Sequence, residues 1–318
     1  MNKVSLITGV AGCVGFNLAK LLLKKNHLVY GLDNFSKGSK NNLKDLLKNK
    51  NFFFKKINLD EIKNINLLKN FLPNTIDYAW LLAANSDILK GVKNFDIDYR
   101  NTFLTTLNTV SAIKHKLKNK KTKIIFTSSS AIYGPVNKII DEQIYSFNPI
   151  SNYGKYKLYS EFFLESFSRM CNAKTLILRF PNVVGNPFTH GILYDFFRKY
   201  KKNNTKLKIL GDGNQRKPYC HVKEIVNCIY FLSKKNFLFD TLLLGPNDNG
   251  IKVKKIAKIF KKQTQKNLKL IFEKKTYGWK GDVIKYNYSV NKLNKMGYRF
   301  KYSSSEAIIY SVNELFQS

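Results

Sequence analysis

Short apolar runs alternate, along the first part of the chain, with longer stretches whose apolar residues recur at helical spacing. The short runs are rich in β-branched and aromatic residues, as buried strands are. The longer stretches resemble 13–25, where Val14, Leu18 and Leu22 share one helical face. The pattern predicts strands at 3–8, 27–33, 51–57, 77–84, 123–129 and 175–180, and helices at 13–25, 39–49, 61–71, 98–118 and 152–171.

Strand–helix–strand repeats with connections of this length build a parallel sheet that helices cover on both faces. The right-handed crossover rule then gives a doubly wound arrangement. The sequence therefore predicts an α/β fold with a doubly wound parallel sheet of the Rossmann type.

The regular alternation ends at Phe180. Proline and glycine become frequent from Pro181 onward, for example in GDGNQRKP (211–218), and they mark loops and short elements. We therefore expect a sheet-containing domain over 1–180 and a smaller, irregular substrate-binding portion over 181–318. The second part would pack on the sheet and close a cleft, with elements of the two parts interleaved.

The composition is that of a folded protein, since 44% of the 318 residues are hydrophobic and 14% are aromatic, whereas disordered chains are poor in both. No apolar run is long enough to span a membrane, and the opening MNKVSLITGV differs from a signal peptide. The four cysteines (Cys13, Cys171, Cys220 and Cys228) form no C-x-x-C pair and no zinc-binding pattern. We therefore expect a cytoplasmic protein with free thiols, no membrane segment and no bound metal.

The formal net charge of +34 raises the question of nucleic-acid binding. The basic residues are 49 lysines and 6 arginines, although base and phosphate recognition favours the planar fork of arginine. Lysine is also spread over the whole chain together with asparagine, isoleucine and phenylalanine, residues that share A/T-rich codons. We therefore predict no nucleic-acid partner, but a diffuse positive field that attracts an anionic substrate such as a nucleotide diphosphate.

A glycine-rich turn, TGVAGCVG (8–15), joins the first predicted strand to the first predicted helix. Gly9, Gly12 and Gly15 would allow a tight turn, a close approach of the backbone to a phosphate, and close packing of the helix on the strand. Asp33 ends the second predicted strand, where a carboxylate accepts hydrogen bonds from ribose hydroxyls and repels a 2′-phosphate. The turn and the acid together predict a dinucleotide and favour NAD over NADP.

The segment SNYGKYK (151–157) places Tyr153 and Lys157 four residues apart. In a helix the two side chains lie on one face and on adjacent turns, so both can reach one reacting group. Such a pair alone is also typical of a solvated helix face. An ammonium beside a phenol favours the phenolate, so we expect Lys157 to lower the pKa of Tyr153 and to make it a usable base near neutral pH.

With these two motifs the chain resembles the extended short-chain dehydrogenase/reductase family, most closely its nucleotide-sugar epimerases of the UDP-glucose/UDP-galactose 4-epimerase type. The resemblance runs over nearly the whole chain. It implies an NAD cofactor, a nucleotide-diphosphate sugar as substrate, and a homodimer formed through the helices at 98–118 and 152–171. The further segments that carry it are LDNFSKGSKNNL (32–43), INLD (57–60), LLAANSD (81–87), NTFLT (101–105), TSSSAIYG (127–134), RFPNVVGN (179–186) and LGDGNQRKPYCHV (210–222).

Carried over position by position, the resemblance implies that Ser129, Tyr153 and Lys157 are catalytic. Tyr153 would act as the base, and Lys157 would hold the nicotinamide ribose. The implied cofactor-binding residues are Gly9, Gly12, Cys13, Val14, Gly15, Asp33, Asn34, Asn58, Leu59, Ala83, Ala84, Asn101, Tyr153, Lys157 and Phe180. The implied substrate-binding residues are Ser129, Ser130, Tyr153, Asn182, Arg216, Tyr219, Asp282 and Tyr286.

The chain departs from the family pattern at YGWKGD (277–282), where the family often has an arginine that grips the diphosphate. Lys280 or Lys275 could substitute only as a point charge, which puts substrate affinity or identity in doubt. Asn58 also stands where the family usually has aspartate. Tyr286 falls where some epimerases use a bulky residue to exclude an N-acetyl group, which implies an unacetylated hexose.

The chemistry implied by the resemblance is epimerisation at C4 of the sugar through a 4-keto intermediate. A decarboxylase, a 4,6-dehydratase or a reductase of the same fold remains an alternative, as does an NAD-binding regulator without activity. A dehydratase is disfavoured, because Ser130 and Ala131 stand where dehydratases carry an aspartate–glutamate pair.

Overall fold

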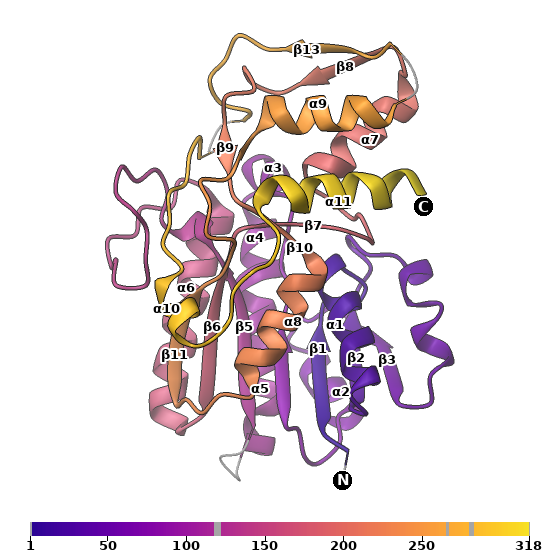
Figure 1. Ribbon diagram of the computed structural model, residues 1–318. Coiled ribbons are helices and arrows are strands. Elements are labelled where there is room, and N and C mark those ends of the chain that lie inside the picture. Colours follow the sequence, from indigo (N-terminus) through magenta and orange to yellow (C-terminus); the bar gives the residue numbers. More distant parts are fainter. Residues whose placement is uncertain (1, 118–121, 265–266, 280–282, 318) are drawn as a thin grey trace. The chain divides into compact units, whose positions relative to one another are not determined.

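The computed structural model describes residues 2–117, 122–264, 267–279 and 283–317. The chain divides into two units whose segments alternate along the sequence (Figure 1). The first unit contains Met1–Ser129, Asn152–Arg179 and Val226–Leu242, and the second contains Ser130–Ser151, Phe180–Ile225 and Leu243–Ser318.

The first unit is built on a seven-stranded sheet with the order β11-β6-β5-β4-β1-β2-β3. Strand β1 pairs in parallel with both β2 and β4, and β2–β3 and β4–β5 are parallel as well. The strand order reverses between β1 and β4, and ligands bind at such a switch point in open α/β sheets. The strands are β1 Val4–Thr8, β2 Leu28–Asp33, β3 Phe52–Lys56, β4 Tyr78–Leu81, β5 Lys123–Ser129, β6 Lys174–Phe180 and β11 Phe239–Leu243.

Helices cover both faces of this sheet, as the alternation of apolar runs predicted. Helices α2, α5 and α6 bury one face in a core that includes Phe126, Val110 and Leu164, and α1 and α8 lie on the other side (Figure 1). The doubly wound parallel sheet is therefore confirmed. The helices are α1 Cys13–Lys24, α2 Asn64–Phe71, α3 Ile88–Lys93, α4 Asp96–Asp98, α5 Thr105–Ile113, α6 Asn152–Cys171 and α8 Val222–Ser233.

Two predicted helices have a different form. The stretch 39–49 makes only two 3₁₀ turns, Lys40–Leu43 and Leu46–Lys48, because the Asn42 side chain donates a hydrogen bond to the carbonyl of Ala11 and ties the segment to the glycine turn. The stretch 98–118 is helical but not uniform: a π-helix Tyr99–Leu104 precedes α5, and a 3₁₀ turn Lys114–Leu117 follows it. The strand expected over 77–84 ends at Leu81, since the next two N–H groups donate to the hydroxyl of Thr8.

The second unit contains short two-stranded ladders packed with helices. Strand β7 pairs in parallel with β10, β8 pairs in parallel with β13, and β9 pairs antiparallel with β12. Its core centres on Phe260, which contacts the rings of Phe196 and Phe316. The elements are a 3₁₀ turn Ser130–Ile132, β7 Asn182–Val184, α7 Ile192–Lys202, β8 Lys206–Ile209, β9 Arg216–Lys217, β10 Tyr219–His221, β12 Ile251–Lys252, α9 Val253–Gln263, β13 Lys269–Phe272, α10 Asn291–Lys295 and α11 Ser304–Gln317.

None of the helices in the described ranges combines the length and the apolar character that crossing a membrane requires.

Candidate active site

The glycine-rich turn lies where β1 ends and α1 begins. Gly9 has φ +73°, a left-handed conformation that favours glycine, and its N–H donates to the carbonyl of Leu32 at 2.8 Å. Gly12 is the N-cap of α1, and it provides no side chain to cap the helix. Cys13 and Val14, predicted to contact the cofactor, are the first half-buried residues of α1.

The three glycines serve different purposes. A Cβ at Gly15 would lie 2.2 Å from the carbonyl oxygen of Gly9, and a Cβ at Gly9 would lie 3.0 Å from the Cα of Ala83. Both positions are therefore required for close backbone packing. A Cβ at Gly12 would meet nothing within 4 Å except the oxygen of Gly9 at 3.3 Å. The turn thus leaves open space at Gly12 beside a helix N-terminus, which fits the pyrophosphate of a dinucleotide.

Asp33 ties the end of β2 to the glycine turn. One carboxylate oxygen accepts from the N–H of Ala11 at 2.9 Å and the other accepts from the N–H of Phe35 at 2.7 Å. Burial raises the pKa of Asp33, and these backbone donors oppose that rise. Each oxygen keeps further acceptor capacity, so the carboxylate fits the expected role of binding ribose hydroxyls. Asn34 follows it and accepts from the N–H of Ser36.

Most of the remaining predicted cofactor residues lie at or just beyond the ends of neighbouring strands. Ala83 and Ala84 follow β4, and the N–H of Ala83 donates to the hydroxyl of Thr8 at 3.1 Å. Leu59 is buried, and its carbonyl accepts from the side chain of Asn108 at 2.8 Å.

Two of these residues instead direct their amides to their own chain segment. The side chain of Asn58 donates to Glu61 at 3.0 Å. The side chain of Asn101, in the π-helix, donates to the carbonyl of Ile97 at 3.1 Å. Phe180 ends β6 and is buried. The cofactor roles of these residues stay predictions.

The predicted catalytic residues of the first unit come together. Ser129 is the last residue of β5, and Tyr153 is the second residue of α6. A hydrogen bond from Ser129 favours the phenolate form of Tyr153. Lys157 lies one turn further along α6, with its Nζ 5.9 Å from the centre of the Tyr153 ring. A hydroxyl, a phenol and an amine are thus assembled at the carboxyl end of the sheet.

The electrostatics of this pair differ from the expectation. Burial raises the pKa of Tyr153 to about 12, and the hydrogen bond from Ser129 opposes this only in part. Burial likewise lowers the pKa of Lys157 to about 7. The prediction of a lowered Tyr153 pKa is therefore wrong for this structure, because loss of hydration disfavours the charged form of both groups and outweighs any effect of the amine.

Lys157 is held firmly although it is only 2% exposed. Its Nζ donates to the carbonyl of Thr127 at 2.5 Å and lies 4.6 Å from the centre of the Phe126 ring. Both contacts come from β5, so this strand positions the amine as well as Ser129.

A buried ion pair that joins α6 to β6 was not predicted from the sequence. Arg179 of β6 binds Glu161 of α6, with Nη2 and Oε2 2.7 Å apart and the two side chains 6% and 5% exposed. Glu161 is one helical turn beyond Lys157 and raises its pKa against the larger effect of burial. One signal was present, because an arginine within the apolar run TLILRF requires a buried partner.

Asn182 and Tyr219, predicted to bind substrate, are neighbours in the second unit. They are paired residues of β7 and β10. The Asn182 side chain donates to the carbonyl of Pro218 at 3.2 Å, and the Tyr219 N–H donates to the hydroxyl of Ser304 at 3.0 Å. Arg216 lies on β9, and its guanidinium is 3.4 Å from the side-chain oxygen of Asn287.

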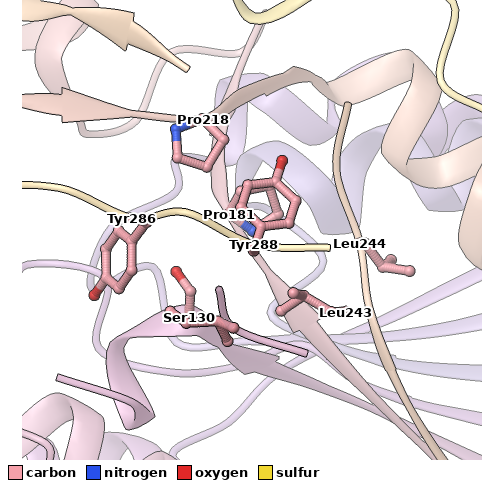
Figure 2. Close-up of a pocket in the computed structure, with 8 residues that line it drawn as sticks. Ser130, Pro181, Pro218, Leu243, Leu244, Tyr286 and Tyr288 are labelled. Atoms are coloured by element: carbon pink, nitrogen blue, oxygen red, sulfur yellow. The ribbon is translucent and has the colours of Figure 1, made fainter. Parts of the chain in front are cut away.

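Ser130 and Tyr286 line a small cavity in the second unit. Figure 2 shows the Ser130 hydroxyl directed toward the space between the rings of Tyr286 and Tyr288. The cavity has a volume of only about 10 Å³, enough for one water molecule at most. Tyr286 is 6% exposed, and its role in sugar selection stays a prediction. Asp282, also predicted to bind substrate, and Lys280 lie outside the described residues.

Comparisons with known proteins point in one direction. The model of the NAD dependent epimerase/dehydratase family matches residues 5–240. A protein of Methanocaldococcus jannaschii named "Putative UDP-glucose 4-epimerase" is 26% identical over 316 residues, which cover 97% of each chain. A UDP-glucuronate 4-epimerase of Thermodesulfobacterium geofontis is 26% identical over 83% of this chain and 81% of its own. The solved UDP-glucose 4-epimerase of Thermotoga maritima, with UDP-glucose, has a TM-score of 0.85 and 25% identity over 99% of both chains.

Proposed function

The chain belongs to the NAD dependent epimerase/dehydratase family, and on this premise we propose that it interconverts the C4 epimers of a nucleotide-diphosphate sugar, with NAD as cofactor. The observation that supports this most directly is the assembly of Ser129, Tyr153 and Lys157, with the hydroxyl of Ser129 bonded to the phenol and the amine one turn away. Relatives that span most of the chain are named 4-epimerases of UDP-glucose and of UDP-glucuronate.

In the proposed reaction Tyr153 removes the proton of the C4 hydroxyl and later returns it. Bound NAD supplies a reversible hydride acceptor for C4. Because its pKa is raised to about 12, Tyr153 is a phenol at neutral pH, so it acts as a base only when positive charge lies close to it. Lys157 contributes that charge in its ammonium form, and its pKa of about 7 makes this form accessible near neutral pH.

Ser129 stabilises the reacting oxygen. Its hydroxyl is hydrogen-bonded to the phenol of Tyr153, and a hydrogen bond donated by this hydroxyl to the C4 oxygen would stabilise the ketone as it forms. The 4-keto sugar would then turn within the site and regain the hydride on its other face. The net redox change is zero, so we expect the cofactor to stay bound through the cycle.

The proposed grip on the nucleotide diphosphate lies in the second unit, on Asn182, Arg216 and Tyr219. These residues sit on β7, β9 and β10, where ladder hydrogen bonds fix the backbone. Tyr286 would face the sugar and restrict its size. The relatives named above do not agree on one sugar, so the proposal covers UDP-hexoses as a class.

The alternatives within the family are less well supported. A 4,6-dehydratase needs an acid–base pair after its catalytic hydroxyl residue, and Ser130 and Ala131 offer neither. A regulator that binds NAD without turnover has no need of a serine, a tyrosine and a lysine in matched positions. The epimerase is therefore favoured over both.

We also propose that the enzyme is a cytoplasmic homodimer. Helix α6 and the preceding π-helix carry exposed aromatic residues, among them Tyr99, Tyr159 and Phe162. Exposed apolar residues grouped on neighbouring helices are typical of a protein–protein interface. Light scattering of the purified enzyme tests the dimer, and a monomer at micromolar concentration would contradict it.

The decisive experiment is a product assay. The purified protein is incubated separately with UDP-glucose and with UDP-glucuronate, and the sugar C1 proton signals are followed by NMR. We expect one of them to be converted to its C4 epimer without added reductant. Tight NAD binding without turnover of any nucleotide sugar would instead support the regulator.

A further inference from the structure

Asp98, the last residue of α4, is a carboxylate buried beside the catalytic helix. Its side chain is 0% exposed. Oδ1 accepts a hydrogen bond from the amide of Asn85 at 2.7 Å, and Oδ2 has no hydrogen-bond partner in the described part of the chain. A carboxylate so poorly compensated is costly to bury, which indicates a role other than packing.

The chain makes room for this carboxylate at one position. A Cβ at Gly91 of α3 would lie within 1.8 Å of the Asp98 Oδ2, so only glycine leaves space for the carboxylate there. The carbonyl of Gly91 also accepts from the side chain of Asn152, the first residue of α6, at 3.4 Å. Asp98, Gly91 and the start of α6 therefore form one packed cluster within the first unit.

The carboxylate faces the N-terminus of α6. Burial raises the pKa of Asp98, and the amide of Asn85 and the backbone N–H of Tyr153 oppose that rise only in part. The first turn of α6 contains no acidic residue of its own. A negative charge at a helix N-terminus stabilises its free N–H groups. Asp98, from α4, therefore supplies the carboxylate that the first turn of α6 lacks.

The cluster continues toward the segment that follows Asp33. Asn85 also donates to the carbonyl of Asp87 at 2.9 Å, and the carboxylate of Asp87 binds the Nζ of Lys37 at 2.8 Å. Lys37 belongs to the loop after β2, which packs on the glycine turn, since a Cβ at the adjacent Gly38 would lie 2.3 Å from the carbonyl oxygen of Ala11. Polar contacts thus run without a break from this loop to Asp98.

We propose that Asp98 is a positioning residue for Tyr153: it fixes the first turn of α6, and its charge sets the pH range over which the phenol exchanges its proton. The inference rests on the proposed function, since it gives Tyr153 the role of acid and base. It is supported by the pKa of Tyr153, which burial raises most and the charge of Asp98 raises further.

The polar groups around Tyr153 and Asp98 determine what a substitution of Asp98 changes. Tyr153 faces Ser129 from β5 and Lys157 from its own helix. Asp98 faces Asn85 and the charge of Asp87, which Lys37 and Lys90 partly balance. Replacing Asp98 by asparagine therefore removes one negative charge near the phenol and leaves these partners in place.

The first test is the pH profile of kcat/KM for Asp98→Asn. Removing the charge makes the phenolate easier to form. The part of the pH profile that reports the ionisation of Tyr153 should therefore move by about one pH unit toward lower pH. The matched control is Asp96→Asn, the same change at an exposed residue of the same short helix, which should leave the profile in place. A purely structural role would lower kcat/KM by one factor at every pH, and that outcome would overturn the electrostatic part.

The second test does not require turnover. Hydrogen exchange of the peptide spanning 152–158 is measured by mass spectrometry in the wild type, Asp98→Ala and Gly91→Ala. Asp98→Ala removes the carboxylate and Gly91→Ala displaces it. Both should speed hydrogen exchange of this turn by about fivefold or more, as the loss of a helix cap does. Exchange in β5 should not change. Unaltered exchange at 152–158 in both variants would overturn the positioning role.

The two tests separate this inference from the proposed function. Faster exchange in a protein that epimerises no nucleotide sugar would remove the proposed function and retain the structural role of Asp98. An active epimerase with unaltered exchange and an unaltered pH profile would remove the inference alone. If Asp98→Ala does not fold, Asp98→Asn and Gly91→Ala still decide the question.

Discussion

Lys157 is buried and Tyr153 is half-buried, and burial moves their pKa values apart, from 10.0 to about 12 for the phenol and from 10.5 to about 7 for the amine. Both groups are therefore inclined to be neutral, the phenol protonated and the amine half-protonated near pH 7. A site in this condition gains charge only when a ligand or a reacting group stabilises it. The residue-scale predictions follow from this.

Tyr153→Phe should lower kcat by about 10²–10⁴-fold, the typical contribution of a positioned acid–base group. The variant keeps the ring and its packing, so it should retain NAD, measured by absorbance after the cofactor is released by heat. Tyr156→Phe, the same change three residues away on α6, serves as the control and should remain active. A Tyr153→Phe enzyme with most of its activity would remove Tyr153 from the mechanism.

Lys157 should make stability depend on pH in a defined window. Its pKa is about 7 in the folded chain against 10.5 ordinarily, so the unfolded chain binds more protons between these values, and stability should rise with pH across that window. Lys157→Met removes this contribution. The unfolding free energy of the wild type minus that of the variant should rise from pH 7 to 9, by roughly 1.4 kcal/mol per pH unit at most.

Urea unfolding at three pH values measures this difference. Lys155→Met is the control, because Lys155 is exposed on the same helix, and its difference from wild type should stay constant with pH. A constant difference for Lys157→Met as well would show that the amine remains charged in the folded chain.

At the scale of elements, α6 carries both the catalytic candidates and two ion pairs, one buried and one exposed. It presents Tyr153 and Lys157 toward the sheet edge, and one turn later it buries Glu161 against Arg179 of β6. The same helix carries a second pair, Glu165 and Arg169, whose side chains are 37% and 76% exposed. The two pairs allow a comparison of burial within one element.

Glu161→Gln should destabilise the fold by about 3–5 kcal/mol, because it leaves the Arg179 charge buried without a partner. Glu165→Gln should change stability by about 0.5 kcal/mol or less, since exposed pairs contribute little. Urea unfolding of the two variants measures both effects. Equal effects would mean that water reaches Arg179 in the folded protein.

The elements that the sequence predicted well are those with strong periodicity. Helix α6 and strand β5 begin and end at the predicted residues, 152–171 and 123–129. The stretch 39–49 was predicted less well, because the hydrogen bond from Asn42 to Ala11 is a tertiary contact that no local pattern reveals. The ladders of the second unit are two to four residues long, too short for any period to show.

At the scale of the whole molecule, the order of strands and helices was enough to predict the doubly wound sheet, and the resemblance of the motifs was enough to predict the family; both are confirmed. The catalytic candidates were found because sequence motifs place them. Asp98 and Arg179 were not found, because their roles depend on partners 13 and 18 residues away in the sequence that only the fold brings close. A single boundary at residue 180 does not describe the interleaved units, since Val226–Leu242 belongs to the first unit.

The net charge of +34 is the remaining property of the whole chain that bears on function. A nucleotide-diphosphate sugar is an anion, and a positive field raises its local concentration and its rate of association. This matters more here because the segment 277–282 has no arginine to grip the diphosphate. Diffuse attraction by lysines would then compensate for the pair of hydrogen bonds that an arginine would donate to the diphosphate.

Salt should therefore weaken substrate capture without slowing the chemistry. Raising the ionic strength from about 0.01 M to about 1 M shortens the Debye length from about 30 Å to about 3 Å, and kcat/KM should fall by about tenfold or more. The contacts of Lys157 are buried and are screened much less, so kcat should hardly change. Steady-state kinetics at several concentrations of potassium chloride measure both quantities. If kcat/KM is independent of salt, the lysines play no part in capture, and a specific contact must hold the diphosphate instead.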